Sequence, residues 1–480
     1  AVWYCLSADK NDSSGPVKVV FKTKALDFSG AFLLLSAQLF VFQASFPSEF
    51  FLPALRVRPA IVIFLPDSSL LSRGKKVNEV FNAVKITDKV WWVGAIDWKI
   101  RDFHGYQTSR GTTYNAYLVM GEKITLIDTV KEAFMDEMLS RIRSVVDLSK
   151  IEYIVSNHAE MDHSGALNQT VALCPNAAVL ASKMGVRALN EQLHPTYKIR
   201  EVADGEKLDI GGLTLEFCET RMLHWPDSMF TYIPELKLLF SQDGFGMHLA
   251  SSERFASEID AGVLNYEFAK YYANILMLFA PFIKKTIARL HELCWNLDYI
   301  LPDHGPVWEK DDIPWWVERY SDWAEMPPGN KALVVYDTMW GSTARMAAAI
   351  GEGLMQGGLS VKLLPLAGNH RSDVATEVLG AGVLVVGSPT INNNMFPAIA
   401  DVLTYLKGLK PLNLVGGVFG SYGWGGEAAG QVTEVLEKMS VEMPLEPLRV
   451  KYVPTAEQLI LCREFGLKIA DSLNEKIKHN

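Results

Sequence analysis

The sequence predicts an α/β chain that ends in a doubly wound parallel sheet. Short apolar segments alternate with amphipathic segments over residues 80–308, and after residue 331 near-continuous apolar strands alternate with helices. Strands that are apolar along their whole length are typical of a parallel sheet covered on both faces. The run Pro327, Pro328, Gly329 and Asn330 forms a turn-rich break between these regions. We therefore expect a domain boundary there.

The individual elements follow from hydrophobic periodicity. Strands are expected where β-branched and aromatic residues form short runs, and helices where apolar residues recur every three or four positions. The expected strands are Val90–Ala95, Tyr114–Met120, Lys123–Asp128, Ile151–Ser156, Lys331–Tyr336, Ala381–Gly387 and Leu414–Phe419. The expected helices are Glu132–Val146, Ser342–Met355, Pro397–Leu406 and Glu427–Met439.

Length, charge and cysteine content limit the possible functions. A chain of 480 residues predicts two or three domains. The net charge is −9 and no long basic run occurs, which argues against a nucleic-acid partner. The five cysteines are far apart and no CxxC pair exists, which excludes a rubredoxin-type iron site, a zinc ribbon and a thioredoxin motif within this chain. Sparse thiols fit a cytoplasmic protein.

Residues 1–79 differ from the rest. Ala31–Phe42 is strongly apolar, and Phe50–Phe64 is rich in Phe, Leu, Val and Pro. Neither run reaches the ~18 apolar residues of a membrane span. Three lysines precede the first run, as in a signal peptide, but the run starts late and no A-x-A cleavage site follows. We expect an unassigned apolar extension, non-native or poorly ordered, with a membrane-associated leader as the alternative.

The densest chemistry lies in the segment SNHAEMDHSG, residues 156–165. His158, Glu160 and Asp162 alternate, so an extended loop can project them to one side, while His163 points elsewhere and suits a second metal. Four polar groups packed together are costly to bury without a cation. The HxExDH spacing therefore predicts a metal site.

Three further candidates occur singly beside turn-forming residues. They are His224, Asp243 and His304. Taken alone, each is better explained as a hydrogen-bonded buried His or a turn Asp. Together with the cluster they give four His and three carboxylates, with no thiolate. This set suits iron, because carboxylate and imidazole together bind it well and zinc has no redox chemistry; zinc and manganese remain open on ligand type.

Three loops in the last third follow predicted strands. The first, Tyr336–Thr343, opens a helix and offers hydroxyls and free backbone N–H groups to a phosphate, without the lysine of a nucleotide-hydrolysing loop. The second and third are residues 388–394 and 420–426. In a doubly wound sheet, ligands bind at this edge. Thr390, Asn392 and Asn393 can contact a ring edge, and Tyr422 and Trp424 offer stacking surfaces.

The two halves resemble two known folds. The HxExDH region resembles the metallo-β-lactamase fold, whose usual motif is HxHxDH, with Glu160 in place of the second His. The last third resembles flavodoxin. In this order they resemble the flavodiiron proteins (A-type flavoproteins) over residues 80–480, and the supporting stretches are VGAIDWKIRDFHGYQTSRGTTYNAYLV (93–119), ETRMLHWPDSMF (219–230), YDTMWGST (336–343), GSPTINNN (387–394) and GSYGWGGE (420–427).

The resemblance implies a domain organisation and a set of site residues. It implies an αββα di-iron domain over 80–328 and an FMN-binding domain over 329–480. One iron is placed on His158, Glu160 and His224, the other on Asp162, His163 and His304, with Asp243 as the bridge. In some family members His158 is turned away from the metal. His104 matches a position beside the metals that could donate a proton to substrate, and a structural turn His is equally consistent. The FMN contacts implied are Thr338, Met339, Trp340, Gly341, Ser342, Thr343, Pro389, Thr390, Asn392, Asn393, Ser421, Tyr422, Gly423 and Trp424.

The resemblance also implies a function. It implies an oxidoreductase of electron transport that reduces O2 to water, NO to N2O, or both, because two irons and FMN together supply up to four electrons. The donor is expected to be a separate protein such as rubredoxin. A head-to-tail homodimer or a tetramer is implied as well. The alternatives are a zinc hydrolase with a fused flavodoxin-like domain, which Glu160 argues against, and an electron carrier whose metal domain is only structural, which the complete ligand set argues against.

Overall fold

The computed structural model of the chain describes residues 80–479. The predicted extension of residues 1–79, which includes Cys5, lies outside the described residues. The four cysteines within the described range, at positions 174, 218, 294 and 462, are all free thiols. Residues 80–479 belong to one compact unit.

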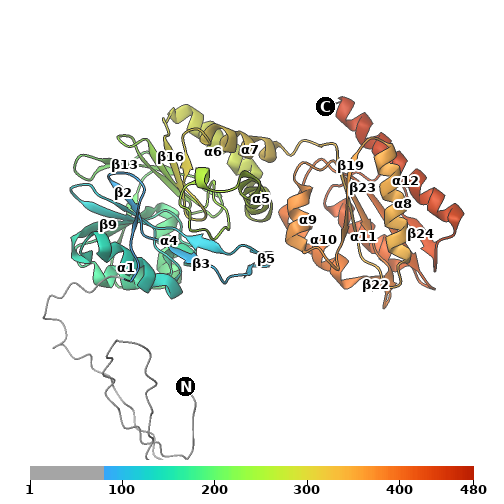
Figure 1. Cartoon of the computed structure of the whole chain (residues 1–480), viewed down its shortest axis with the longest axis horizontal. Coiled ribbons are helices and arrows are strands. Elements are labelled where there is room, and N and C mark those ends of the chain that lie inside the picture. The colour runs from blue at the N-terminus through green and yellow to red at the C-terminus, as the bar shows by residue number, and fades with distance from the viewer. Residues whose placement is uncertain (1–79, 480) are drawn as a thin grey trace, which may run out of the picture. The chain divides into compact units, whose positions relative to one another are not determined.

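The first half is built on two β-sheets (Figure 1). The seven-stranded sheet has the order β1 (Val84–Lys85), β2 (Val90–Trp92), β7 (Tyr117–Val119), β8 (Ile124–Ile127), β9 (Ile151–Ser156), β10 (Ala178–Ser182) and β11 (Ile199–Val202). The six-stranded sheet has the order β12 (Lys207–Asp209), β13 (Thr214–Glu219), β14 (Met229–Ile233), β15 (Leu238–Gln242), β16 (Tyr299–Pro302) and β17 (Trp308–Glu309). Two small hairpins pair β3 (Ala95–Asp97) with β6 (Thr112–Tyr114), and β4 (Asp102–Phe103) with β5 (Tyr106–Gln107).

Helices cover the outer faces of both sheets. They are α1 (Met135–Val145), α2 (Met161–Ser164), α3 (Leu167–Leu173), α4 (Lys183–Leu193), α5 (Ala261–Tyr271), α6 (Ala280–Leu293) and α7 (Ile313–Glu325). A π-helical turn, η5 (Tyr272–Leu276), and a 3-10 turn, η6 (Met277–Phe279), link α5 to α6. The remaining 3-10 turns are η2 (Glu132–Phe134), η3 (Leu148–Lys150) and η4 (Ala256–Glu258).

Alternation along the strands produces the αββα layers. Successive residues of a strand point to opposite faces of the sheet. In β7, Leu118 packs in the cluster that holds α1 and α4, whereas Tyr117 and Val119 pack against the second sheet. The outer face of the second sheet packs on α5, α6 and α7, as Phe230 does. The predicted metallo-β-lactamase-like layer order is therefore present.

The second half is a five-stranded parallel sheet. Its order is β19 (Ser360–Pro365), β18 (Lys331–Tyr336), β20 (Val383–Gly387), β23 (Val415–Tyr422) and β24 (Leu448–Lys451). In chain order this is 2-1-3-4-5, the flavodoxin-like arrangement. Its helices are α8 (Ser342–Gln356), α9 (Arg371–Val378), α10 (Pro397–Leu409), α11 (Glu427–Lys438) and α12 (Ala456–His479), and β21 (Thr390–Ile391) pairs with β22 (Asn394–Met395).

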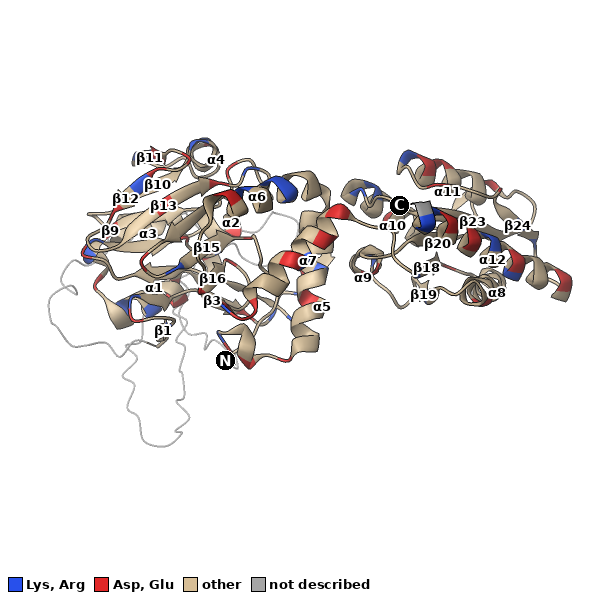
Figure 2. Ribbon diagram, turned by 90° about the horizontal axis from the view of Figure 1, so that it is seen from above, with Lys and Arg blue, Asp and Glu red and all other residues tan. Residues whose placement is uncertain are grey.

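Both faces of this sheet are covered, as the apolar strands predict. Ala332 and Val334 of β18 pack on α8 and α12. Leu333 and Val335, on the other face, pack in the cluster that holds α9, α10 and α11. In Figure 2 the charged residues gather on helices and loops, and β18, β20 and β23 are largely tan. This pattern confirms the doubly wound parallel sheet.

The predicted elements are found with two corrections. Each expected helix and the strands β8, β9, β18 and β20 lie within a few residues of their predicted bounds. Val90–Ala95, however, is not one strand, since β2 ends at Trp92 and β3 begins at Ala95 in another sheet. The chain passes from one sheet to the other at Gly94. Glycine fits there because any Cβ at this position would lie 2.3 Å from the Tyr114 carbonyl oxygen and clash with it. Tyr114–Met120 likewise divides into β6 and β7.

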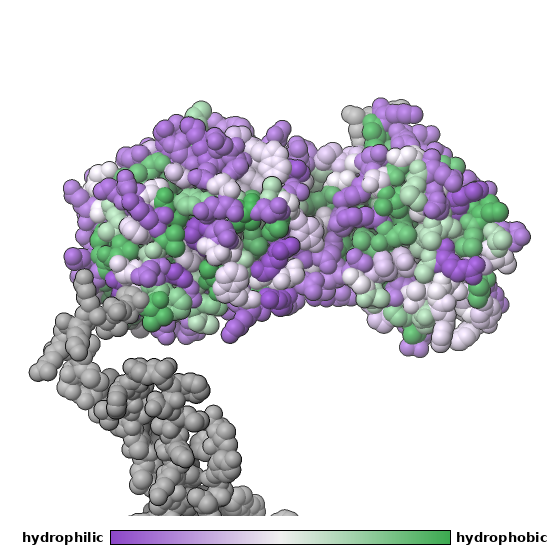
Figure 3. Space-filling view, in the orientation of Figure 1, coloured by the Kyte–Doolittle hydropathy of each residue, from purple (hydrophilic) through white to green (hydrophobic). Residues whose placement is uncertain are grey.

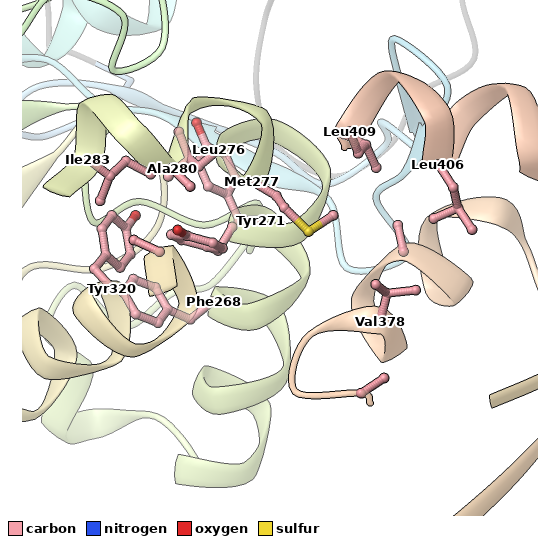
Figure 4. Packing of buried hydrophobic residues seen from close by; sticks show 14 of the residues in the cluster. Phe268, Tyr271, Leu276, Met277, Ala280, Ile283, Tyr320, Val378, Leu406 and Leu409 are labelled. Carbon is pink, nitrogen blue, oxygen red and sulfur yellow. The ribbon is translucent and has the colours of Figure 1, made fainter. Parts of the chain in front are cut away.

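The two halves share an apolar contact. In Figure 4, Met277 extends from the first half toward Val378, Leu406 and Leu409 of the second, and all four belong to one buried cluster. Figure 3 shows apolar residues on the viewed face as separate patches among hydrophilic ones. No helix within residues 80–479 combines the length and the apolar character needed to cross a membrane.

Polar bonds join the halves beside this contact. Lys270 Nζ, on a side chain that is only 2% exposed, lies 2.7 Å from Asp373 Oδ1. Tyr405 donates to Asn274 Oδ1 at 2.8 Å, and the Asn274 amide donates to the Ser372 carbonyl at 3.1 Å. A buried ammonium needs such a partner, because an unpaired buried charge is strongly destabilising. The contact is therefore specific as well as apolar.

Candidate metal centre and ligand pocket

The seven predicted ligands lie at the carboxyl ends of four strands. His158 and Glu160 follow β9, and Asp162 and His163 stand on the short helix α2 directly after them. His224 lies in the loop after β13. Asp243 follows β15 directly, and His304 follows β16 by two residues. Strand ends hold these side chains on a rigid frame while leaving them at the edge of the sheets.

The structure brings the seven residues together in two groups. His158, Glu160, His224 and Asp243 can each present one ligand atom, all within 4.8 Å of one another. The same holds for Asp162, His163 and His304. In the first group, Glu160 Oε2 lies 3.3 Å from His158 Nε2 and 3.2 Å from His224 Nε2.

Asp243 faces both groups, one oxygen to each. Its Oδ2 lies 2.9 Å from His224 Nε2 and 3.5 Å from His158 Nε2. Its Oδ1 lies 3.2 Å from His163 Nε2 and 3.5 Å from His304 Nε2. One carboxylate is thus placed to contact two cations at once. In the second group Asp162 completes the set, with Oδ2 3.2 Å from His304 Nε2.

Unpaired buried atoms show that these residues fit a metal. Within residues 80–479, both oxygens of Asp162, both ring nitrogens of His163 and Oδ1 of Asp243 are buried without a hydrogen-bond partner. Leaving a buried polar group unsatisfied costs about 1–3 kcal/mol, and more for a charged group. A cation held by each group would satisfy these atoms. The donor set of imidazoles and carboxylates suits iron, as it also suits other divalent transition metals.

The protonation states follow from the same crowding. Burial opposes the charge on His163, yet Asp162 and Asp243 raise its pKa to about 10. Burial likewise disfavours the ionised Asp243, but the surrounding histidines hold its pKa well below the ordinary value. The pKa of Glu160 is lowered against burial by His158 and His224. In the metal-free protein, protons on the histidines therefore balance the carboxylates.

A cradle of polar residues holds the loop that carries His304. Asn115 donates from Nδ2 to the carbonyl oxygens of Pro302 and Gly305, at 2.7 and 2.9 Å, and accepts from Trp92 Nε1 at 2.8 Å. His304 Nδ1 donates to the Thr113 carbonyl at 2.5 Å. The stretch TTYNAY (112–117) thus fixes the ring of one predicted ligand.

His104 lies at the rim of the site. It occupies the turn between β4 and β5 with a φ of 55°, its side chain is 74% exposed, and its Nε2 is 3.4 Å from Glu160 Oε1. This position is beside the first group of predicted ligands. Its catalytic role remains a prediction.

Three residues near the predicted ligands were not predicted from sequence. Asp227 accepts from His158 Nδ1 at 3.1 Å. Asp303 Oδ2 lies 3.5 Å from His163 Nδ1, and burial raises the pKa of this carboxyl well above its usual range. His248 bonds through Nδ1 to Thr112 Oγ1 at 2.8 Å, and its ring lies 4.6 Å from that of His304 and 5.0 Å from that of Tyr271. None of the three belongs to a recognised metal-binding motif, so only their closeness in sequence to His224, His304 and Asp243 could have suggested them.

A pocket of about 820 Å³ opens at the carboxyl edge of the parallel sheet. It is lined by Met339, Trp340, Ser342, Pro389, Thr390, Ile391, Asn392, Asn393, Ser421, Tyr422, Gly423, Trp424, Gly425, Tyr452 and Val453. The three predicted loops thus meet at one pocket. Trp340 and Trp424 are highly exposed at its edge.

Three predicted contacts do not line the pocket. Thr343 is fully buried and its hydroxyl lies 2.9 Å from Ser421 Oγ, so it braces the pocket wall. Thr338 Oγ1 accepts from the Gly341 N–H at 3.1 Å, which supports a turn where Gly341 has a φ of 82°. Ser421 and Tyr422 end strand β23 instead of lying in a loop. Tyr452 and Val453 were missed because they follow β24, whose loop carries no phosphate-type signature.

Comparison with known proteins identifies the family. The family described as ODP family beta lactamase matches residues 112–305, and flavodoxin matches residues 334–466. The nitric oxide reductase of Moorella thermoacetica is 45% identical over 391 residues, which cover 81% of this chain and 98% of that protein. The chain belongs to the flavodiiron protein family.

Two solved structures of the family share the whole described fold. The rubredoxin oxygen:oxidoreductase of Desulfovibrio gigas is 42% identical with a TM-score of 0.81, over 82% of this chain and 100% of that one. The flavodiiron protein of Giardia intestinalis is 35% identical with a TM-score of 0.80, over 84% and 100%. These matches confirm the resemblance to the flavodiiron family and the predicted fold class. They also confirm the prediction that the protein is an oxidoreductase. They do not favour the zinc-hydrolase alternative.

Proposed function

We propose that this flavodiiron protein reduces O2 to water, NO to N2O, or both, at a di-iron site fed by FMN. The observation that carries the proposal is Asp243, whose two oxygens face two separate groups of ligands. A carboxylate between two cations suits metals that change oxidation state together. The names of the relatives, a nitric oxide reductase and an oxygen oxidoreductase, support both substrates.

The two cofactors have separate sites in the chain. One iron would be held by His158, Glu160 and His224, and the other by Asp162, His163 and His304, with Asp243 shared. FMN would occupy the pocket between Trp340, Asn393 and Tyr422, with its phosphate at the first turn of α8. Bound there, the irons and the flavin would supply the electrons for reduction. We place the di-iron domain at 80–328 and the FMN domain at 329–480.

The residues of the chain supply orientation and protons. His104 stands at the open rim with its Nε2 toward Glu160 and is placed to donate a proton to a bound substrate. Phe103 packs against its ring with the centroids 4.5 Å apart, and this contact limits the directions in which the imidazole can point. The buried histidines, in contrast, are enclosed and suited to hold metal.

A content measurement tests the proposal first. Purified protein should hold about one FMN and two irons per chain and show flavin absorption. Zinc without iron, together with hydrolysis of a thioester or β-lactam, would refute the proposal. Mixing the reduced protein with O2 and with NO in an anaerobic stopped-flow instrument then separates the two substrates. Failure to oxidise with either would also refute it.

We further propose an external rubredoxin-type donor and a cytoplasmic location. The donor is suggested by the name of the Desulfovibrio gigas relative. The location is suggested by the sparse cysteines. Reduction of the bound flavin by rubredoxin, measured anaerobically, tests the donor; no reduction under saturating rubredoxin would exclude it.

We also propose a head-to-tail homodimer, alone or within a tetramer, in which the flavin of one chain faces the irons of the other. The exposed rings of Trp340 and Trp424 beside the pocket support a partner on that side. Mixing an iron-deficient His224→Ala variant with a Thr390→Trp variant, whose indole fills the flavin pocket, should restore part of the activity. No recovery despite demonstrated subunit exchange would show that each chain works alone.

A further inference from the structure

Asp227 lies behind the metal-facing ring of His158. It stands three residues after His224, on the loop between β13 and β14, and it is only 3% exposed. Ser182 Oγ donates to the Asp227 carbonyl at 2.7 Å, which ties this loop to the start of α4. The loop between β13 and β14 thus carries the predicted ligand His224 and also Asp227, the hydrogen-bond partner of the predicted ligand His158.

One oxygen of Asp227 makes both of its contacts with the β9 loop. Oδ2 lies 3.1 Å from His158 Nδ1 and accepts from the Ala159 backbone N–H at 2.6 Å. Oδ1 is buried without a hydrogen-bond partner among the described residues. The carboxylate is therefore fixed relative to the backbone next to His158, and its direction determines where the imidazole can donate.

This contact sets both the tautomer and the rotation of the ring. When Nδ1 carries the proton that Asp227 accepts, Nε2 keeps its lone pair, and Nε2 faces Glu160 at 3.3 Å and Asp243 at 3.5 Å. A ring turned by 180° would break the bond to Asp227. His304 has a comparable bond, but to the backbone carbonyl of Thr113, which no side-chain substitution removes.

We propose that Asp227 is a positioning residue that holds His158 with Nε2 toward the first metal and thereby decides whether His158 is a ligand. Partners of this kind orient the ligand ring and typically change metal affinity by ~10–100-fold. The inference rests on the proposed di-iron function. It assigns His158 to the metal in the resting protein, a point that the family resemblance leaves open.

Two substitutions of Asp227 separate its geometry from its charge. Because one oxygen accepts both hydrogen bonds, Asp227→Asn can keep both bonds with its amide oxygen while losing the charge. Asp227→Ala loses bonds and charge together. The matched control is Asp260→Ala, which removes a carboxylate that accepts from the Val263 N–H at 3.0 Å at the start of α5, away from the ligands.

Iron content and the Mössbauer spectrum of 57Fe-loaded protein are the readouts. We expect Asp227→Ala to lose ~10–100-fold in affinity for one iron and to alter one of two quadrupole doublets. Asp227→Asn and Asp260→Ala should keep both irons and both doublets. In a His158→Ala background, Asp227→Ala should add no further loss, since it acts through His158.

Several outcomes would overturn the inference. Two unchanged doublets in Asp227→Ala, or an Asn variant as defective as the Ala variant, would exclude positioning by hydrogen bonds. If Asp227→Ala does not fold, the tautomer of His158 in the zinc-loaded wild-type protein, measured by 15N NMR, decides: a proton on Nδ1 is expected, and one on Nε2 refutes the inference. Wild-type protein that binds no iron would refute the proposed function instead.

Discussion

Substituting Asn115 by Leu should destabilise the fold around His304. The side chain is 1% exposed and makes three hydrogen bonds, to Trp92 Nε1 and to the carbonyl oxygens of Pro302 and Gly305. Leu has the same branched arrangement of side-chain heavy atoms and no polar atoms, so the substitution removes the bonds without opening a cavity.

The expected loss follows from the groups left behind. Trp92 Nε1 and the Gly305 carbonyl would lose their side-chain partner, whereas the Pro302 carbonyl keeps a bond from the Tyr117 hydroxyl at 2.8 Å. Two orphaned buried groups at about 1–3 kcal/mol each give a loss of about 2–6 kcal/mol. This is a large part of the ~5–15 kcal/mol that stabilises a typical domain.

Urea denaturation of the metal-free protein measures this loss, and iron content after reconstitution measures the effect on the site. With a slope of about 2 kcal/mol per molar urea, the midpoint should fall by roughly 1–3 M. The iron held by His304 should be lost first. As a control, Asn176→Leu removes an exposed amide that donates to the Ser149 carbonyl at 2.7 Å, and it should stay within about 0.5 kcal/mol of wild type. An equally small change for Asn115→Leu would refute the reasoning.

Three further predictions concern the metals and the contact between the halves. Asp243→Ala should lose more iron than Glu160→Ala, because Asp243 faces both groups and Glu160 only the first; equal iron contents by elemental analysis would argue against a bridge. Iron affinity should rise with pH, because the carboxylates raise the pKa of His163 from 6.5 to about 10 despite burial, and metal must displace that proton. The raised pKa stabilises the metal-free fold fully below about pH 6.5, and this stabilisation is lost as pH rises through about 10; calorimetry in buffers of different ionisation enthalpy should detect proton release near pH 7, and its absence would show a neutral His163. Asp373→Ala should destabilise by about 3–5 kcal/mol because it leaves the buried Lys270 ammonium unpaired, whereas Lys270→Met, which removes that charge, should cost clearly less in a denaturation experiment; equal costs would contradict a buried ion pair.

Four of the seven residues that the structure brings together could be predicted from the sequence because they are close along the chain. His158, Glu160, Asp162 and His163 lie within six residues directly after a strand that periodicity identifies. Local spacing therefore carries most of the information. His224, Asp243 and His304 each follow a strand as well, but they were assigned through the family resemblance, since an isolated His or Asp has several ordinary explanations.

The residues that sequence reasoning missed act across long separations. Asp227 is 69 positions from His158, and Asn115 is 187 positions from Pro302. No periodic pattern links such pairs, because strand pairing and loop packing create them. Tyr452 reaches the pocket for the same reason, through the last strand of the sheet. The division of Val90–Ala95 into two strands was missed because a contact with Tyr114, not local composition, turns the chain at Gly94.

The buried cluster that joins Met277 to Val378, Leu406 and Leu409 makes the two halves less modular than their sequence suggests. A flavodoxin acts as a free carrier because its surface is complete by itself. Here, cutting the chain at residues 327–330 would leave apolar side chains and the Lys270 ammonium facing water on one piece and their partners on the other. The peptide link then acts mainly as a tether that raises the effective concentration of two surfaces already complementary. The flavodoxin-like half is in this sense a fixed component of the protein, held by its own contact surface as well as by the peptide link.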